Sequence, residues 1–333
     1  MSPAALALRG QGRAFARALR QARTRTLPHA MTLVGARGSG KTTAARAIAQ
    51  ALLCDAAVSD HPDAACGSCP ACKKFLADAH PDLLKLEVPE DKKEIPVEQV
   101  RELLASLCFS TSEGRGRVAL IDPGDALNEQ GQNALLKTLE EPGVHTWLLL
   151  PTTRPESLLA TVRSRVQRLP ILPLASAEVR AGLVSPGAEI SSQESAELCV
   201  RLASGSLGLA RELAASDLVP LLDLVDQALG GGAELTPPAL AKALLLGASG
   251  KAEVEARVRQ VLLLLRARHR EAASAVMGST LDPVANASYS VDFLDRWIAV
   301  CDALCDAEED LQLSIPVELA LTGALLRIRS AQS

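Results

Sequence analysis

The sequence predicts an α/β fold, in which a parallel sheet is followed by two helical parts. Short apolar stretches alternate with helical stretches up to about residue 170, and a glycine-rich turn joins the first strand to the first long helix. Beyond that point the apolar residues follow a helical spacing. Strands that alternate with helices predict a parallel sheet that is covered on both faces.

The glycine-rich turn, residues 35–42, has the P-loop sequence G-x-x-x-x-G-K-T. A short apolar strand is expected just before it, at 31–34, and an alanine-rich helix just after it, at 43–53. Backbone N–H groups of such a loop hold phosphate oxygens, the lysine reaches the outer phosphates, and the threonine hydroxyl binds Mg²⁺. The positive end of the following helix dipole points at the same anion. We therefore expect this chain to bind ATP or ADP together with Mg²⁺.

The rest of the first half continues the alternation between strands and helices. Strands are expected at 82–88, 117–122, 146–150 and 166–169, and helices at 97–108 and 128–141. The second of these helices should end where it does because Pro142 and Gly143 follow it. In the helical part of the chain, residues 251–273 have the amphipathic pattern of a long packed helix.

Four cysteines between the P-loop helix and the next strand form the pattern C-x11-C-x2-C-x2-C. The C-x2-C steps let pairs of thiolates converge on one ion, and four thiolates complete a tetrahedral zinc shell with no open position. We therefore expect a structural zinc site, with ligands Cys54, Cys66, Cys69 and Cys72. Disulfide bonds are the alternative, and a reducing compartment would disfavour them. The other cysteines are expected to be buried as small apolar residues; they are Cys108, Cys199, Cys301 and Cys305.

The composition restricts the classes of protein to which the chain can belong. Hydrophobic residues make up 48% of it and aromatic residues only 2%, so the cores are expected to be aliphatic. A formal charge of −4 and a pI near 5.8 argue against a free-standing protein that coats duplex DNA. No apolar run has membrane-spanning length, and residues 1–15 lack the apolar core of a secretory signal. We expect a cytoplasmic protein with no membrane partner.

Several short motifs, taken together, carry a resemblance to a known family. In chain order they are Gly10-Gln11, Leu27-Pro28-His29-Ala30, the four cysteines, His80-Pro81-Asp82, the run Asn133-Ala134-Leu135-Leu136-Lys137-Thr138-Leu139-Glu140-Glu141-Pro142, Thr152-Thr153 and Ser164-Arg165. With these motifs the chain resembles the AAA+ clamp-loader family of bacterial DNA polymerase III, strongly over about residues 10–170. Its His-Pro-Asp region and its length are more similar to the delta prime branch than to the gamma/tau branch.

The resemblance implies an architecture and a set of partners. Residues 1–170 would be an AAA+ nucleotide-binding domain with a zinc knuckle at 54–72, residues 171–216 a small helical lid, and residues 217–333 an all-helical collar that oligomerises. The partners would be the gamma/tau and delta subunits, with the sliding clamp and primer–template DNA reached through the complex. The chain would then be a component of a DNA-directed DNA polymerase holoenzyme.

The resemblance also assigns roles in a nucleotide site. Asp122 matches the Walker B acid that holds Mg²⁺, and Thr153, eleven residues before Ser164, matches the sensor-1 position. The residues expected to bind nucleotide are Gly35, Gly38, Gly40, Lys41, Thr42, Thr43, Asp122 and Thr153. Hydrolysing relatives carry a glutamate where this chain has Pro123, and an arginine where it has Gly208. Proline has no proton acceptor, so we expect poor hydrolysis; Glu129 and Glu140 are the alternative carboxylates that would have to fold back.

Arg165 matches the arginine of the family's Ser-Arg-Cys motif, with Val166 in place of the cysteine. In the family this arginine is presented across a subunit boundary to the ATP of a neighbour. A guanidinium suits that role because it is always charged and its planar fork fits phosphate oxygens. Arg165 is therefore the expected catalytic residue in trans, an arginine finger; Arg163 and Arg168 are the nearby alternatives.

Two other functions fit part of the sequence. An ATP-hydrolysing motor subunit of the gamma/tau type would share the P-loop and the cysteines, but it would carry Glu at position 123 and Arg at position 208. A P-loop NTPase unrelated to replication would need the cysteine pattern, the leucine-rich run before Pro142 and the Ser164-Arg165 pair to have arisen by chance.

Overall fold

A computed structural model describes residues 10–89, 92, 94–183, 193–203, 205–214, 219–229, 236–248, 250–278, 291–312 and 315–332. The chain divides into two compact units. The first takes the described residues of 1–185 together with those of 204–209, and the second takes those of 186–203 and 210–333. Residues of the expected lid fall in both units, and the division into three domains stays a prediction.

The first unit contains five parallel strands in the order β2-β3-β4-β1-β5. They are β1 (Ala30–Val34), β2 (Leu83–Glu87), β3 (Arg117–Asp122), β4 (Thr146–Thr152) and β5 (Gln167–Pro170). The α/β fold class with a parallel sheet is thus confirmed. Because β1 lies inside the sheet, the P-loop that follows it opens at the carboxyl edge, beside the ends of β3 and β4.

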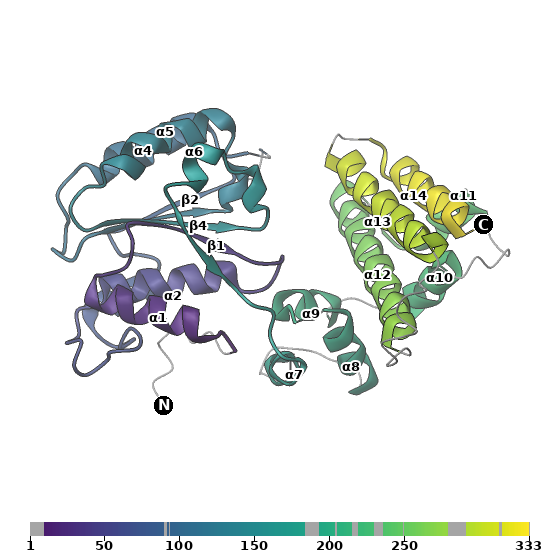
Figure 1. The fold of residues 1–333 in the computed structure, drawn as a ribbon, viewed down its shortest axis with the longest axis horizontal. Coiled ribbons are helices and arrows are strands. Elements are labelled where there is room, and N and C mark those ends of the chain that lie inside the picture. Colours follow the sequence, from purple (N-terminus) through teal and green to yellow (C-terminus); the bar gives the residue numbers. More distant parts are fainter. Residues whose placement is uncertain are drawn as a thin grey trace. The chain divides into compact units, whose positions relative to one another are not determined.

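Helices cover both faces of this sheet (Figure 1). Helices α1 (Arg13–Thr24) and α2 (Lys41–Leu53) lie on one face, and α4 (Val97–Leu107), α5 (Glu129–Glu140) and α6 (Ala160–Arg163) on the other. Strand β3 shows why. Its Val118 and Leu120 belong to the core beneath α1 and α2, whereas Ala119 and Ile121 belong to the core beneath α4 and α5. Side chains alternate along a strand, so a strand that is apolar throughout needs a cover on each side.

Short elements complete the first unit. They are α3 (Pro70–Leu76), the 3₁₀ turns η1 (Gly124–Ala126) and η2 (Pro155–Ser157), and α7 (Ser176–Leu183). Helix α3 begins within the cysteine pattern, where Cys69 is its N-cap and Pro70 its first residue. A proline fits that position because the first N–H groups of a helix have no partner within the helix. Helix α9 (Leu207–Ala214) begins in the first unit and ends in the second.

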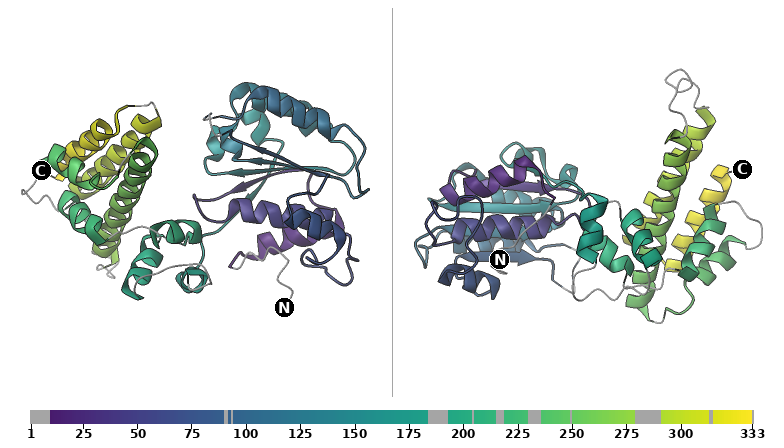
Figure 2. Two further views of the ribbon diagram at one scale, coloured as in Figure 1. Left: turned by 180° about the vertical axis from the view of Figure 1, so that it is seen from behind. Right: turned by 90° about the horizontal axis from the view of Figure 1, so that it is seen from below.

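The described part of the second unit is helical. Its elements are α8 (Gln193–Leu202), α10 (Val219–Leu229), α11 (Pro237–Leu244), α12 (Lys251–Gly278), α13 (Val291–Gln312) and α14 (Val317–Gln332). Helices α12, α13 and α14 pack side by side (Figures 1 and 2), and Leu264 of α12 and Leu321 of α14 are fully buried. The long helix expected over 251–273 is confirmed. Among the described residues, no helix is both long and apolar enough to span a membrane.

The expectation that four further cysteines are buried is wrong for most of them. Cys199 is buried, but Cys301 is half-buried, and Cys108 and Cys305 are exposed. Cys108 caps the end of α4, one residue past the buried Leu107, so it lies beyond the apolar face of that helix.

Candidate nucleotide site and four-cysteine centre

The P-loop has the backbone that its glycines allow. Gly38 and Gly40 have φ angles of 72° and 90°, in the left-handed region, and Gly40 is the N-cap of α2. A side chain at either position would strain the backbone. Gly35 is constrained by space, since an added Cβ would lie 2.7 Å from the carbonyl oxygen of Ile171. All three glycines therefore serve the shape of the loop.

Lys41 and Thr42 bring the P-loop to the end of β3. Lys41 Nζ donates to the carbonyl oxygen of Ala36 at 2.9 Å, and the Thr42 hydroxyl donates to the Asp122 carboxylate. Burial raises the pKa of Asp122, and the bond from Thr42 partly offsets that shift. Burial likewise lowers the pKa of Lys41, against the pull of Asp125 and Asp122. The structure thus assembles the expected lysine, threonine and acid at one point, where a bound cation or phosphate would favour their charged forms.

The expected sensor residue lies one position beyond β4. Thr153 is exposed, and its backbone N–H donates to Asp125 Oδ1 at 3.0 Å. Thr152, the last residue of the strand, is buried instead and accepts a hydrogen bond from the Thr32 hydroxyl at 3.1 Å. One oxygen of the Asp125 carboxylate thus holds the end of β4.

The segment 205–209 contacts the P-loop within the first unit. The backbone N–H of Gly208 points to the carbonyl oxygen of Gly38 at 3.4 Å, and a Cβ on Gly208 would lie 3.3 Å from Gly38 Cα. A Cβ on Gly38 would lie 2.2 Å from Ser206 Oγ. Where hydrolysing relatives would carry an arginine, Gly208 thus brings its backbone into direct contact with the backbone of Gly38. The sequence did not predict this contact.

Arg165 lies between α6 and β5, on the surface of the first unit. Its Nη2 lies 2.7 Å from Glu140 Oε1, and its Nη1 donates to the carbonyl oxygen of Thr161 at 3.0 Å. Strand β5 begins at Gln167, which pairs with Met31 at the start of β1. Arg165 is therefore at the amino edge of the sheet, whereas the P-loop is at the carboxyl edge. Four residue-to-residue steps of β1, from Ala30 to Val34, separate the two edges, or about 13 Å.

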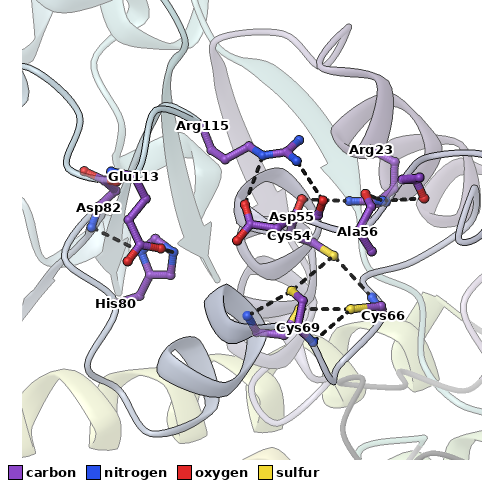
Figure 3. Close-up of polar contacts among 12 residues, drawn as sticks. Arg23, Cys54, Asp55, Ala56, Cys66, Cys69, His80, Asp82, Glu113 and Arg115 are labelled. Atoms are coloured by element: carbon purple, nitrogen blue, oxygen red, sulfur yellow. Dashed lines mark hydrogen bonds and ion pairs between the residues drawn. The ribbon is translucent and has the colours of Figure 1, made fainter.

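The four cysteines of the expected zinc site converge (Figure 3). Their sulfur atoms all lie within 4.8 Å of one another, at 4.0 Å for Cys54 and Cys69 and 3.9 Å for Cys66 and Cys72. Four sulfurs around a zinc ion, at Zn–S distances of about 2.3 Å, are about 3.8 Å apart. A disulfide would need about 2.05 Å, and all four thiols are free. The residues present fit a tetrahedral zinc ion.

The local backbone and the thiols themselves favour thiolates in this cluster. The N–H groups of Ser68 and Cys69 donate to Cys66 Sγ at 3.4 and 3.3 Å, as in a turn built around a ligand. A hydrogen bond from the Cys72 thiol lowers the pKa of Cys54, and the same bond raises the pKa of Cys72. Zinc binds thiolates, so loading this cluster would release thiol protons.

Three buried polar groups near the cysteines were not assigned a role from the sequence. The Asp82 carboxylate accepts the backbone N–H groups of Ser112 and Glu113 at 2.8 and 2.9 Å. His80 Nδ1 accepts the N–H of Asp82 at 3.2 Å, and burial lowers the pKa of this histidine. The sequence pointed to His80 and Asp82 only through the family resemblance of the His-Pro-Asp motif, which gave them no role. The third group, the guanidinium of Arg23, had no signal in the sequence.

Comparison with known proteins identifies the family of the chain. Residues 10–175 match the family described as "DNA polymerase III, delta subunit". The chain is 30% identical to DNA polymerase III subunit delta' of Escherichia coli over 305 residues, which are 90% of this chain and 88% of that protein. It belongs to the DNA polymerase III delta prime family. The family resemblance inferred from the P-loop, the cysteines and the leucine-rich run is thereby confirmed.

Two other relatives match over shorter parts of the family's sequence. Subunit delta' of Pseudomonas aeruginosa is 41% identical over 152 residues, 45% of each chain. Subunit tau of Escherichia coli is 34% identical over 207 residues, 61% of this chain and 30% of tau. The aligned segments thus span less than half of these two relatives.

Proposed function

We propose that this delta prime family member is a regulatory subunit of the DNA polymerase III clamp loader. It binds nucleotide, hydrolyses it poorly, and supplies Arg165 to the ATP of a neighbouring subunit during loading of the sliding clamp onto primed DNA. The observation that carries the proposal is the placement of Arg165 and the P-loop at opposite edges of one sheet.

The parts that hold a triphosphate are all present. The glycines, Lys41 and Thr42 have the geometry of a P-loop at the start of α2, and Asp122 lies within hydrogen-bond reach of Thr42. These residues would hold the phosphates and Mg²⁺ of ATP, whose charge then offsets the burial of Lys41.

Positions 123 and 208, both among the described residues, lack the carboxylate and the guanidinium that a hydrolysing subunit would carry. Pro123 offers no carboxylate to orient a water molecule, and the Asp125 carboxylate is bonded to the backbone N–H of Thr153. Gly208 brings backbone, and no cation, to Gly38. Nucleotide bound in this site would therefore stabilise the folded protein without being hydrolysed at a useful rate. A ligand present at one hundred times its Kd stabilises a protein by about 2.7 kcal/mol.

The placement of Arg165 supports action on another chain. Arg165 precedes the first residue of β5, about 13 Å along the sheet from the edge where the P-loop opens, and this is farther than an arginine side chain reaches. It is half-exposed at the surface and so can be presented to a neighbour. The partners that follow from this role are the gamma/tau and delta subunits, with clamp and DNA contacted through the complex. The four-cysteine centre would hold one structural zinc.

Nucleotide binding and hydrolysis test the proposal separately. Titration calorimetry with Mg·ATP should show binding to the purified chain and none to Lys41→Ala. Steady-state ATPase of the isolated chain should be at background, and Pro123→Glu should raise it if the missing carboxylate is the main defect. Brisk turnover by the unmodified chain would refute the regulatory role, and failure to bind would show that the P-loop is vestigial.

A gamma/tau-type motor is the second candidate, favoured by the 34% identity to subunit tau. Pro123 and the Gly38–Gly208 contact argue against it, because a motor needs a carboxylate and an arginine at those places. The ATPase measurement on the isolated chain distinguishes the two candidates directly.

A further inference from the structure

Arg23 is a fully engaged, buried arginine on the inner side of α1. The residue is 4% exposed, and each of its five side-chain N–H groups has a backbone carbonyl acceptor. Nε donates to His61, Nη1 to Ala51 and Cys54, and Nη2 to Ala56 and Ala57, at distances from 2.7 to 3.4 Å. All five carbonyls belong to the end of α2 and the chain that leads into the cysteine cluster. One side chain thus fixes the backbone that presents the first cysteine.

These contacts satisfy the donors of Arg23 but not its charge. Carbonyl groups carry no net charge, and within the described ranges no carboxylate forms an ion pair with this guanidinium. A buried charge without an opposite charge nearby is costly. Nη1 of Arg23 donates to the carbonyl oxygen of Cys54 at 3.2 Å, which places the guanidinium beside the first cysteine. A zinc ion with four thiolates carries two negative charges, which supply the counter-charge that the guanidinium lacks.

The surroundings of the cluster carry a surplus of positive charge. Burial and the guanidinium groups of Arg115 and Arg23 lower the pKa of Arg25, and Asp55 is the acid that offsets them. Arg23, Arg25 and Arg115 thus place positive charge beside Asp55, the residue that follows the first cysteine.

We propose that Arg23 is the positioning residue of this metal centre: it fixes the backbone that carries Cys54 and supplies the positive charge that balances a zinc tetrathiolate. The proposal rests on the zinc site of the proposed function and adds to it the dependence of that site on α1, a helix 31 residues earlier in sequence. Helix α1 and the cysteine segment would then be one unit that the metal completes.

Arg115, which precedes β3 and contacts the cysteine segment at Asp55, provides the contrast. Arg115 donates to Asp55 from Nε at 3.0 Å and to the carbonyl oxygen of Asp55 from Nη2 at 2.8 Å (Figure 3). Its side chain is 31% exposed, and its charge already has a carboxylate partner. Arg20, one turn before Arg23 on α1, is 57% exposed and lies 3.5 Å from Asp63. Neither should matter to metal retention as Arg23 does.

Zinc release tests the proposal on the full chain. Protein loaded with one zinc under reducing conditions is mixed with excess chelator, and the rate of zinc transfer is followed by absorbance. Arg23→Gln removes the charge, Arg23→Lys keeps it with three donors in place of five, and Arg20→Gln is the matched control. We expect release from Arg23→Gln to be faster by about 10–100-fold, as for other residues that support metal ligands, with partial rescue by lysine. Arg20→Gln should release zinc as the unmodified chain does.

Thermal unfolding separates this role from ordinary packing. A residue that only fills space stabilises the zinc-loaded and metal-free proteins equally, whereas Arg23→Gln should lower the melting temperature more in the loaded form. If that variant does not fold by circular dichroism, Arg23→Lys against Arg20→Gln gives the same comparison. Release rates equal to the control in both Arg23 variants would overturn the proposal. An unmodified chain that binds no zinc would instead refute the metal site itself, so the two failures are distinct.

Discussion

Arg165 Nη2 lies 2.7 Å from Glu140 Oε1, so the proposed arginine finger is paired within its own chain. Glu140 is the first glutamate of the Glu140-Glu141-Pro142 sequence that ends α5. The two side chains are 37% and 53% exposed, and an ion pair this accessible contributes at most about 1 kcal/mol. Such a contact can orient the arginine while leaving it free to exchange Glu140 for a phosphate.

Arg165→Ala should lower the clamp- and DNA-stimulated ATPase of the assembled complex. Arginine fingers contribute about 10³–10⁵ in turnover at the site they serve, so the active site that faces this subunit should become silent. Steady-state ATPase measures the effect, and gel filtration checks that the complex still assembles. Arg168→Ala, a neighbouring exposed arginine, is the control. Equal turnover in both variants would remove the role of Arg165 in trans.

Glu140→Gln should release the finger without removing it. Because the pair contributes at most about 1 kcal/mol, the fraction of Arg165 available to a neighbour should rise by up to about fivefold. ATPase of the complex at limiting concentrations of this subunit should therefore rise or hold steady. A fall comparable to that of Arg165→Ala would show that Glu140 positions the arginine for its partner instead of holding it back.

Gly208→Ala should destabilise the first unit, although alanine favours helices. Its Cβ would lie 3.3 Å from Gly38 Cα, where backbone cannot easily move, and overpacking of this kind costs about 1–3 kcal/mol. Gly323→Ala in α14 is the matched control, because its Cβ would meet only Arg327 Nη2, at 4.0 Å. This substitution should raise the free energy of unfolding by up to about 1 kcal/mol. Calorimetry measures both. Stabilisation by alanine at position 208 would contradict a fixed Gly38–Gly208 contact.

His80 should make stability depend on pH. Its usual pKa is 6.5, and burial lowers it in the folded protein, against the charges of Glu113 and Asp82. The unfolded chain therefore binds more protons below pH 6.5, and the free energy of unfolding falls as the pH drops through that value. His80→Asn keeps an acceptor for the Asp82 N–H but cannot titrate. Between about pH 7.5 and about pH 5.5, denaturant unfolding should show a larger loss in the unmodified chain than in the variant. Parallel curves would indicate that another group governs the dependence.

The elements of the first unit could be predicted where the pattern is local. Strand β3 has the predicted bounds, and α4, α5 and β4 differ from prediction by one or two residues at their ends. The order of strands could not be read from the sequence, because it depends on which apolar faces pair. The five-carbonyl contact of Arg23 could not be predicted either, since it joins segments about thirty residues apart that share no spacing pattern.

The candidate site shows the same division. Lys41, Thr42 and the four cysteines occur at spacings whose chemistry requires them to converge, and they do so. Gly208 was recognised as a missing arginine, but its contact with Gly38 depends on a fold between distant segments. Cys108 shows the opposite limit: its apolar character indicated burial, and its place at a helix end decided otherwise.

A subunit that offers a cation at one edge of its sheet and takes up nucleotide at the other has a front and a back. Copies or relatives joined in this way meet head to tail, through two different surfaces, and such contacts give a ring or an open spiral instead of a closed pair. If this chain keeps its nucleotide without hydrolysing it, Arg165 would promote hydrolysis in the neighbouring subunit while none follows in its own site. Such a subunit would fit at the end of a row of hydrolysing subunits, because no neighbour has to supply an arginine to its own site.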